Sequence, residues 1–223
     1  MSAGIQELYY PDGTLQMRTY YDDNNQPHRE DGPAIEEFYK NGAIKHRTWY
    51  IRGKQHRDDG PAHEWFRKNG TLSHHTWYNH GKTERIDGPI EERFYKDGNL
   101  LSRVWSQNSI TTKTTGLLTA AYYPNGVIAR SYRVVLNAAE FNATRQVYEE
   151  FYETGAPKSR EWFYEHKPHR EDGPADERFS PSGHIISTAY YLDGEGLSEA
   201  KYRRRVALRR LTIKTKVDHE VLL

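Results

Sequence analysis

Histidine next to arginine recurs along the chain, and these pairs are the residues best suited to chemistry. An imidazole can bind a metal ion or transfer a proton, and a guanidinium can hold an anion. The pairs lie whole repeats apart, so their histidines cannot converge on one tetrahedral metal site. We therefore predict no metal site and expect the histidines to hydrogen-bond the Asp-Gly-Pro loop of their own or the adjacent copy. The pairs are His28-Arg29, His56-Arg57 and His169-Arg170, with Glu84-Arg85 in the third copy.

Repeated glutamate, aspartate and histidine could in principle provide general acid–base pairs. A catalytic site is normally unique, whereas each of these candidates recurs with the repeat. The sequence has no Gly-rich phosphate loop, nucleophile elbow or metalloprotease helix, and it has no cysteine. We therefore predict that the chain is not an enzyme and that it has no catalytic residues, cofactor or metal. The adjacent His74 and His75 should point to opposite faces of a strand.

A turn glycine recurs every 28 or 29 residues, and this fixed period predicts the architecture. Asp or Asn precedes it in the first five copies, and Asp-Gly or Asn-Gly between alternating segments favours a β-hairpin. An aromatic lies four residues before each glycine, and Tyr or Trp lies seven residues after it except at Arg133. The glycines are Gly13, Gly42, Gly70, Gly98, Gly126, Gly155 and Gly183, and the tryptophans after them are Trp49, Trp77, Trp105 and Trp162.

Two further turn signals divide each copy. Asp-Gly-Pro must lie in a loop or at a strand start, because proline fixes φ and removes a donor. It occurs at residues 31–33, 59–61, 87–89 and 172–174. A third turn closes each unit, at Arg52-Gly53, His80-Gly81 and Asp193-Gly194.

The hairpin register can be predicted from the sequence itself. If the first turn has two central residues, the residue six before the glycine faces the residue five after it. Four such pairs are Glu opposite Arg, and in copy five both partners are replaced together, by Ala120 and Ser131. This joint loss indicates a real cross-strand contact. The pairs are Glu7–Arg18, Glu36–Arg47, Glu64–His75, Glu92–Arg103, Glu149–Arg160 and Glu177–Thr188.

These features predict an all-β fold, an elongated antiparallel β-hairpin repeat array with a short C-terminal helix. Mean hydropathy is −0.98 and aromatic residues make up 13% of the chain, which suits a thin sheet better than a thick aliphatic core. Residues 1–196 would form seven repeats of about 28 residues, with copies four and five degenerate over about 106–146. Residues 197–223 would form a basic helix or tail, with Ser198 as the N-cap.

Units such as residues 49–62 resemble the divergent MORN-type repeats that occur in several copies in proteins of giant DNA viruses. The resemblance covers residues 5–196, and its most specific element is the recurring His-Arg-x-Asp-Gly-Pro-Ala. Typical MORN repeats are shorter and glycine-richer and lack this signature, so we carry over no phospholipid binding. The resemblance implies a β-hairpin array that acts as a scaffold or assembly surface in a virus.

Residues 200–217 differ from the rest of the chain because they hold eight basic residues and no acid. Such a segment can bind nucleic acid, an anionic lipid surface or an acidic protein, or it can be a solvated helix face or associate with the acidic array. The candidate anion-binding residues are Lys201, Arg203, Arg204, Arg205, Arg209, Arg210, Lys214 and Lys216.

The leading functional hypothesis is a non-catalytic scaffold for protein–protein assembly, as a virion (minor capsid) or viral assembly component. Exposed Tyr and Trp rows and Glu–Arg ladders would form its contact surface, with capsid proteins or further copies of the chain as partners. One alternative is an adaptor that holds nucleic acid or anionic lipid through its basic C-terminus, and another is an antitoxin-like binding partner. The absence of cysteine, of a signal peptide and of a membrane-spanning run predicts an intracellular, cytoplasmic protein, or one carried in a virion.

Overall fold

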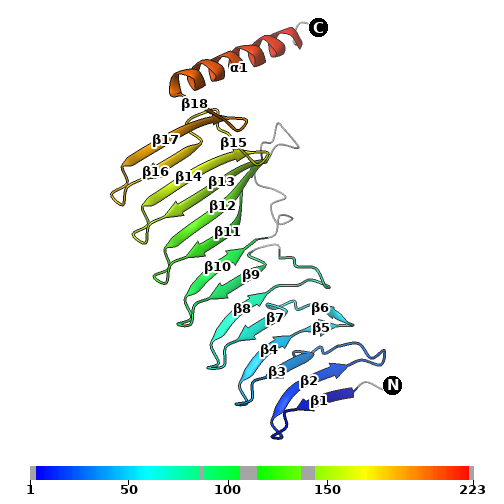
Figure 1. Cartoon of the computed structure of the whole chain (residues 1–223). Helices are drawn as coiled ribbons and strands as arrows, with labels where there is room; N and C mark the ends of the chain where they lie inside the picture. Colours follow the sequence, from blue (N-terminus) through cyan, green and yellow to red (C-terminus); the bar gives the residue numbers. More distant parts are fainter. Residues whose placement is uncertain (1–3, 86–87, 106–114, 137–143, 221–223) are drawn as a thin grey trace. The chain divides into compact units, whose positions relative to one another are not determined.

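The computed structural model describes residues 4–85, 88–105, 115–136 and 144–220 (Figure 1). The chain divides into two compact units, which are described separately. Unit 1 comprises residues 1–112 and 118–127, and unit 2 comprises residues 113–117 and 128–223.

Unit 1 is a meander of short antiparallel strands. Each strand pairs with the next along the hydrogen-bonded order, and the pair β5–β6 forms a separate small ribbon. In sheet order the strands are β1 (Gly4–Tyr9), β2 (Leu15–Tyr21), β3 (Ile35–Phe38), β4 (Ile44–Thr48), β7 (His63–Phe66), β8 (Leu72–Thr76), β9 (Glu91–Phe94), β10 (Leu100–Val104) and β11 (Thr115–Tyr122), of which residues 118–122 belong to this unit, and the ribbon is β5 (Tyr50–Ile51) with β6 (Lys54–Gln55).

Unit 2 continues the same pattern and ends in a helix. Its strands follow one another in antiparallel order, and β15 pairs with β14 beside the main path. The all-β hairpin-repeat class with a C-terminal helix is therefore confirmed within each unit. The elements are β12 (Ile128–Leu136), β13 (Thr144–Phe151), β14 (Pro157–Tyr164), β15 (Lys167–Pro168), β16 (Asp176–Phe179), β17 (Ile185–Leu192), β18 (Glu195–Leu197) and α1 (Glu199–Glu220).

The glycine turns lie where the period predicts them, but their geometry differs from the expected two-residue turn. Gly13 has a φ of 84°, and Asp12 before it is not among the residues with positive φ. The amide of Gly13 donates to the carbonyl of Tyr10, and the register shifts between Leu8 and Tyr9. This is a type I turn followed by a glycine bulge. The extra residue of the bulge restores the register, so the predicted cross-strand pairs are correct although the turn type was wrong.

The third turn is the one that has two central residues with positive φ. Arg52 and Gly53 have φ values of 49° and 73°, and Asp193 and Gly194 have values of 52° and 87°. These are the dihedral signs of a type I′ turn, which matches the twist of its flanking strands. The predicted third turns are therefore confirmed.

Replacing Gly70 by alanine should lower the free energy of unfolding by about 1–2 kcal/mol, because a Cβ is disfavoured at positive φ. Gly70 has a φ of 84°, and an added Cβ would meet no atom within 4 Å, so the loss would come from the backbone alone. Gly70→Asn should cost less, because asparagine tolerates this conformation. Urea unfolding of both variants checks this, and equal losses would contradict it.

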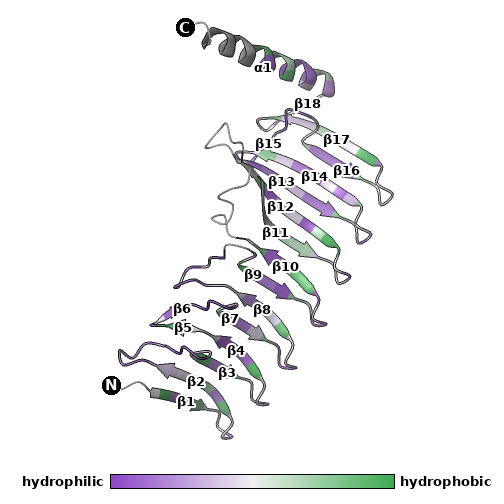
Figure 2. Cartoon of the chain, turned by 180° about the vertical axis from the view of Figure 1, so that it is seen from behind, coloured by the Kyte–Doolittle hydropathy of each residue, from purple (hydrophilic) through white to green (hydrophobic). Residues whose placement is uncertain are grey.

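Small residues fill the interior of the sheet. Ala34 and Ala62, each directly after the proline of an Asp-Gly-Pro loop, are 0% exposed, and Thr19 and Thr48 before the aromatic position are 3% exposed. Strands of both units carry hydrophilic and hydrophobic stretches together (Figure 2). The apolar cluster that involves α1 is formed by Leu192, Tyr202 and Val206, with Tyr190 and Leu197 packed against it. Burial is therefore spread along the repeats and does not form one thick core.

Candidate interaction surface

Four Asp-Gly-Pro loops form the most regular polar feature of the chain. We call residues 29–33 the first loop, 57–61 the second, 85–89 the third and 170–174 the sixth; residues 86–87 of the third loop lie outside the described residues. In each loop an arginine lies over the aromatic ring of its own copy. The distances from guanidinium carbon to ring centre are 4.2 Å for Arg29–Tyr20, 4.1 Å for Arg57–Trp49, 4.0 Å for Arg85–Trp77 and 3.8 Å for Arg170–Trp162.

The loop glycine lies close to the same guanidinium. A Cβ added to Gly60 would lie 3.0 Å from Cζ of Arg57, and one added to Gly173 would lie 3.2 Å from Cζ of Arg170. Each of these arginines thus contacts an aromatic ring and lies close to a glycine of its own loop. Nε of Arg57 also donates to Asp59 at 2.7 Å, and Arg170 donates to Asp172 at the same distance. The Arg-x-Asp-Gly-Pro signature is therefore accounted for by a loop clamp that each copy builds for itself.

The tryptophans of the repeat are part of this clamp. Trp49, Trp77, Trp105 and Trp162 are all half-buried. The expectation of an exposed Trp row is wrong for Trp49, Trp77 and Trp162, because an arginine covers one face of each ring. The residue equivalent to that arginine after Trp105 is Lys113, which lies outside the described residues.

The histidines of the signature connect neighbouring copies. The amide of Arg52 donates to Nδ1 of His28 at 3.2 Å, and the amide of Asp193 donates to Nδ1 of His169 at 3.0 Å. Both acceptors lie 24 residues before their donors. We expected these histidines to hydrogen-bond an Asp-Gly-Pro loop, but they accept from the type I′ turn of the next copy. Nδ1 of His169 also lies 2.9 Å from a carboxylate oxygen of Asp193. One nitrogen cannot accept from the amide and donate to the carboxylate at the same time, so the two contacts exclude each other as hydrogen bonds.

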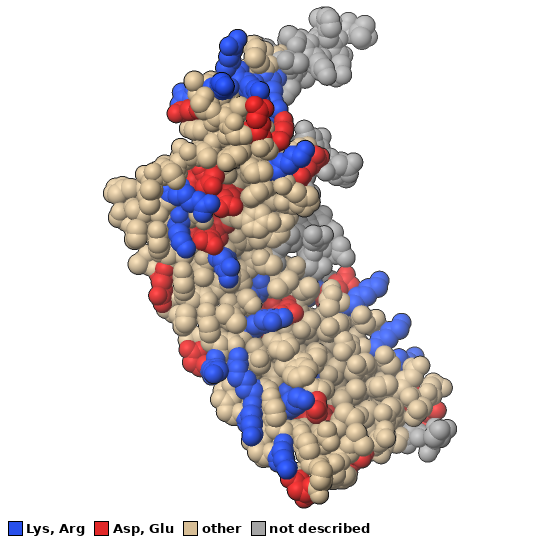
Figure 3. Space-filling model, viewed as in Figure 1, with Lys and Arg blue, Asp and Glu red and all other residues tan. Residues whose placement is uncertain are grey.

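The Glu–Arg pairs have the predicted register. Glu7 faces Arg18, Glu36 faces Arg47, Glu64 faces His75, Glu92 faces Arg103, Glu149 faces Arg160 and Glu177 faces Thr188. The structure adds that the cation also faces the glutamate of the following copy, as Arg47 faces Glu64 and Arg160 faces Glu177, except that Arg103 faces Ala120. Acidic and basic side chains accordingly lie beside one another on the face in Figure 3. Within each unit the pairs form a continuous ladder across strands, which fixes register between copies as well as within them.

Glu92 illustrates how a ladder position is stabilised. Its carboxylate lies 2.8 Å from Nε2 of His75 and 2.6 Å from Nε of Arg103, and its side chain is 14% exposed. Burial alone would raise the pKa of Glu92, but the hydrogen bonds from His75 and Arg103 outweigh it and lower the pKa. The charged groups at such a ladder position therefore pair with one another within the sheet.

A tyrosine three residues before the turn glycine is a further copy-to-copy contact, which our sequence reading did not single out. The hydroxyl of Tyr39 donates to the carbonyl of Phe66 at 2.9 Å, and those of Tyr10, Tyr95 and Tyr152 make the equivalent bond at 2.9, 2.8 and 2.9 Å. Arg67 takes this position in the third copy and donates to the carbonyl of Phe94. The signal was a second periodic aromatic next to the one that we used.

The opposite face of unit 1 holds a cluster of histidines around Trp65. Ring centres of His46 and His74 lie 4.8 and 5.8 Å from that of Trp65, and His63 lies 5.6 Å from both His46 and Trp65. His75 instead contacts Trp77 and Phe94, so the predicted divergence of His74 and His75 is confirmed. Burial, with the charges of His46 and His74, lowers the pKa of His63 to about 4. Among the described residues, no group of three His, Asp or Glu is arranged to hold a metal ion.

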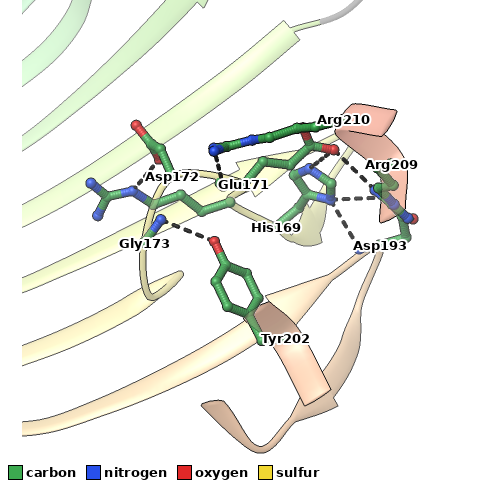
Figure 4. A network of polar contacts seen from close by, with 9 residues as sticks. His169, Glu171, Asp172, Gly173, Asp193, Tyr202, Arg209 and Arg210 are labelled. Atoms are coloured by element: carbon green, nitrogen blue, oxygen red, sulfur yellow. Dashed lines mark hydrogen bonds and ion pairs between the residues drawn. The ribbon is translucent and has the colours of Figure 1, made fainter. Parts of the chain in front are cut away.

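Helix α1 begins at Glu199, directly after the predicted cap Ser198, whose carbonyl accepts from the amide of Tyr202 at 2.9 Å. Figure 4 shows how the helix meets the sixth loop. The amide of Gly173 donates to the hydroxyl of Tyr202 at 3.0 Å, Arg209 contacts the carboxylates of Glu171 and Asp193, and Arg210 donates to the carbonyl of Glu171 at 3.2 Å. The helix is therefore bound to its own last copies.

Half of the candidate anion-binding residues are thus engaged within the chain. Arg203 pairs with Glu199 and Arg205 with Glu195, both at 2.5 Å, and Arg209 and Arg210 contact the sixth loop. Lys201 and Arg204 are exposed. The side chains of Lys214 and Lys216 lie outside those that the structure describes.

Arg209→Gln should loosen α1, because it removes a cation that contacts two carboxylates. We expect amide hydrogen exchange over the first turns of α1 to accelerate about fivefold, as loss of roughly 1 kcal/mol of local stability implies. Arg204→Gln is the matched control, since Arg204 lies on the same helix and is exposed. Equal exchange rates in the two variants would show that the contact with the sixth loop does not hold the helix.

Comparison with known proteins places the first hairpin in a family. Residues 3–23, which include β1 and β2, match the family model described as "MORN repeat variant". The match supports a MORN-type repeat protein. MORN-type repeats indicate a scaffold role in protein or membrane interaction, and the later hairpins of this chain repeat the turn and register of the matched one.

No curated protein sequence matches this MORN-type chain significantly. Among solved structures it is similar to one titled "Crystal Structure of TcdB2-TccC3-TEV", with 12% identity and a TM-score of 0.18 over 87% of this chain and 13% of that one. A likeness at that TM-score carries no argument about function. In the described part of the chain, no helix is both long enough and apolar enough to cross a membrane.

Proposed function

We propose that this MORN-type protein is a non-catalytic scaffold that mediates protein–protein assembly. The observation that carries the proposal is the engagement of the recurring polar residues with neighbouring copies. The loop arginines are stacked on rings, the histidines accept from the next turn, and the ladder glutamates are paired. A residue that is repeated and bonded in this way serves the array, because catalysis requires a site arranged around one reacting group.

The surface left for partners is the rim of the Asp-Gly-Pro loops. Side chains of Glu30, Asp31, Asp58 and Asp59 are between 82% and 93% exposed. Such a row of repeated charged groups suits an extended protein partner. A virion or viral assembly component, an antitoxin-like partner and an intracellular location stay predictions that rest on the resemblance and on composition.

An adaptor that binds nucleic acid or anionic lipid is the second candidate. It is favoured by the exposure of Lys201 and Arg204 and weakened by the internal pairing of Arg203, Arg205 and Arg209. Phosphate-dominated binding falls steeply with salt, so the two candidates separate on that criterion.

The test is affinity purification of the tagged full chain after crosslinking in its native cells, with quantitative mass spectrometry. We expect a defined protein at a reproducible ratio, retained after nuclease treatment and with Lys201→Glu/Arg204→Glu. Recovery of nucleic acid or lipid instead, lost with that double variant, would establish the adaptor. Recovery of the chain without any protein partner would overturn the scaffold proposal.

A further inference from the structure

Strand β17 has an open edge over most of its length. β18 pairs with it only at residues 190–192, and among the described residues no strand pairs with that side of β17 at residues 185–189. Ile186 is 66% exposed, and Ser187 is exposed as well. Ser159 takes the place of Ser187 one copy earlier, where β16 follows, and it is 3% exposed. The edge that a following strand covers in the sixth copy is therefore uncovered in the seventh.

Helix α1 packs on the other end of β17. Its Tyr202 and Val206 form a buried cluster with Leu192, and Tyr190 packs against that cluster. By repeat position α1 begins where an Asp-Gly-Pro loop and then a strand would follow. The exposure of residues 185–188 shows that the helix does not take the place of that strand.

The open edge of β17 also carries no charge. Residues 185–189 read Ile-Ile-Ser-Thr-Ala, whereas the equivalent stretch of each other copy contains Arg, Lys or His. Charged side chains and proline commonly keep an exposed strand edge from pairing with another chain. An uncharged edge that is rich in β-branched residues is instead suited to accept a further strand.

Strand β1 presents a second open edge. It ends the strand order, and within the described residues it pairs only with β2. Tyr9 is 55% exposed, whereas Phe179, at the same repeat position in β16, is 7% exposed. Ile5 is 62% exposed and corresponds to Ile90, whose carbonyl accepts from the amide of Trp77 at 2.8 Å. An isoleucine at this position therefore fits between two consecutive copies.

The contact between consecutive copies shows how the two edges would match. β14 pairs with β16 through three facing positions, and Arg160 with Glu177 is the middle one. By repeat position Thr188 of β17 corresponds to Arg160, and Glu7 of β1 corresponds to Glu177. Like β16, β1 is the first strand of its hairpin, so it would lie antiparallel to β17. Thr188 would then face Glu7, which brings no like charges together.

We propose that two copies of this chain join end to end, with β17 of one copy pairing with β1 of the other. Thr188 would face Glu7, and Ala189 would face Gln6. Each copy uses a different edge, so the contact is heterologous and leaves an edge for a further copy. Ser180 stands where most copies carry the tyrosine that bonds the next copy, so that hydrogen bond has no counterpart. The proposal concerns copies of this chain alone and therefore goes beyond the scaffold function.

Mixing two cysteine variants of the full chain tests the proposed register. Ala189 and Gln6 correspond to Glu161 and Asp176, which face each other between β14 and β16. We expect the chain with Ala189→Cys and the chain with Gln6→Cys to form a mixed disulfide dimer as the main product of oxidation. Ala189→Cys mixed with Glu7→Cys is the matched control and should give little dimer, because a one-residue slip turns the second thiol to the other face.

Sedimentation of the purified chain without added cysteines measures the association itself. Thr188→Arg should tighten it about threefold, because the Arg–Glu pair of the other copies would form between the two chains. Ser187→Arg adds the same charge on the other face of β17 and should not tighten it. Glu7→Gln should abolish the gain from Thr188→Arg.

A monomer at every protein concentration would overturn the proposal. So would equal crosslinking in the matched and control mixtures, or a main product in which Ala189→Cys joins itself, since β17 would then pair with another β17. A gain from Thr188→Arg that is no larger than that from Ser187→Arg, or that survives Glu7→Gln, would overturn it too. None of these results bears on recovery of a different protein by co-purification, so the scaffold proposal stands or fails separately.

Discussion

Replacing Trp49 by alanine should lower the free energy of unfolding by about 3 kcal/mol, near the lower end of the range for removing a large aromatic. The ring packs under the guanidinium of Arg57 at 4.1 Å and lines a groove between two loops. Its loss also leaves Arg57 without its stacking surface. Since stability in a repeat array is a sum of neighbour terms, the second copy would be destabilised first. Urea unfolding followed by circular dichroism measures the effect.

Tyr9→Ala is the control for Trp49, because Tyr9 is 55% exposed and its removal takes away little packing. Trp49→Phe should keep a ring under Arg57 and lose only about 1 kcal/mol. A loss for Trp49→Ala no larger than that for Tyr9→Ala would contradict the loop clamp.

Acidification should destabilise unit 1 between about pH 6.5 and pH 4. Burial, with the charges of His46 and His74, holds the pKa of His63 at about 4, below its ordinary 6.5. In that window the unfolded chain binds more protons than the folded chain, so stability falls as pH falls. We expect the free energy of unfolding to fall by roughly 1–3 kcal/mol, a range that is discounted for the partial exposure of His63. Burial also lowers the pKa values of His46 and His74. Asp12, whose pKa is lowered to about 2 by the hydrogen bonds from Thr14, loses its contribution only at lower pH.

His63→Leu should flatten this pH dependence, because it removes the group whose protonation opposes folding. His184→Gln is the control, since His184 is an exposed residue of unit 2. Unfolding free energies at several pH values between 7 and 4 check this. A pH dependence that His63→Leu leaves unchanged would contradict the role of the histidine cluster.

Much of the fold follows from the sequence because the hairpin signals are local and repeated. The turn glycines, the Glu–Arg register and the helix after Ser198 could all be predicted from spacing. The turn type could not, since Asp-Gly fits both a type I′ turn and a type I turn with a glycine bulge, and the register is the same in both. Only the φ of the residue before glycine separates them.

Contacts between copies were harder to predict. The sequence showed that His169 recurs but not that its acceptor nitrogen meets an amide 24 residues later, because that depends on how one copy lies beside the next. The same holds for the basic segment. Its charges suggested an external anion, but Arg209 and Arg210 contact the sixth loop of the chain itself. A charge run does not reveal which carboxylates fold against it.

The register between copies is the central claim, and disulfide trapping tests it directly because the chain has no cysteine. Glu161 of β14 faces Asp176 of β16. The amide of the next residue, Trp162, donates to the carbonyl of Ala175. Glu161 and Asp176 are therefore a non-hydrogen-bonded pair, whose Cα atoms lie closer together than those of a hydrogen-bonded pair. Glu161→Cys/Asp176→Cys should therefore oxidise readily to a disulfide, whereas Glu161→Cys/Glu177→Cys should not, because a one-residue slip turns the second thiol to the other face. Faster crosslinking of the slipped pair would contradict the account.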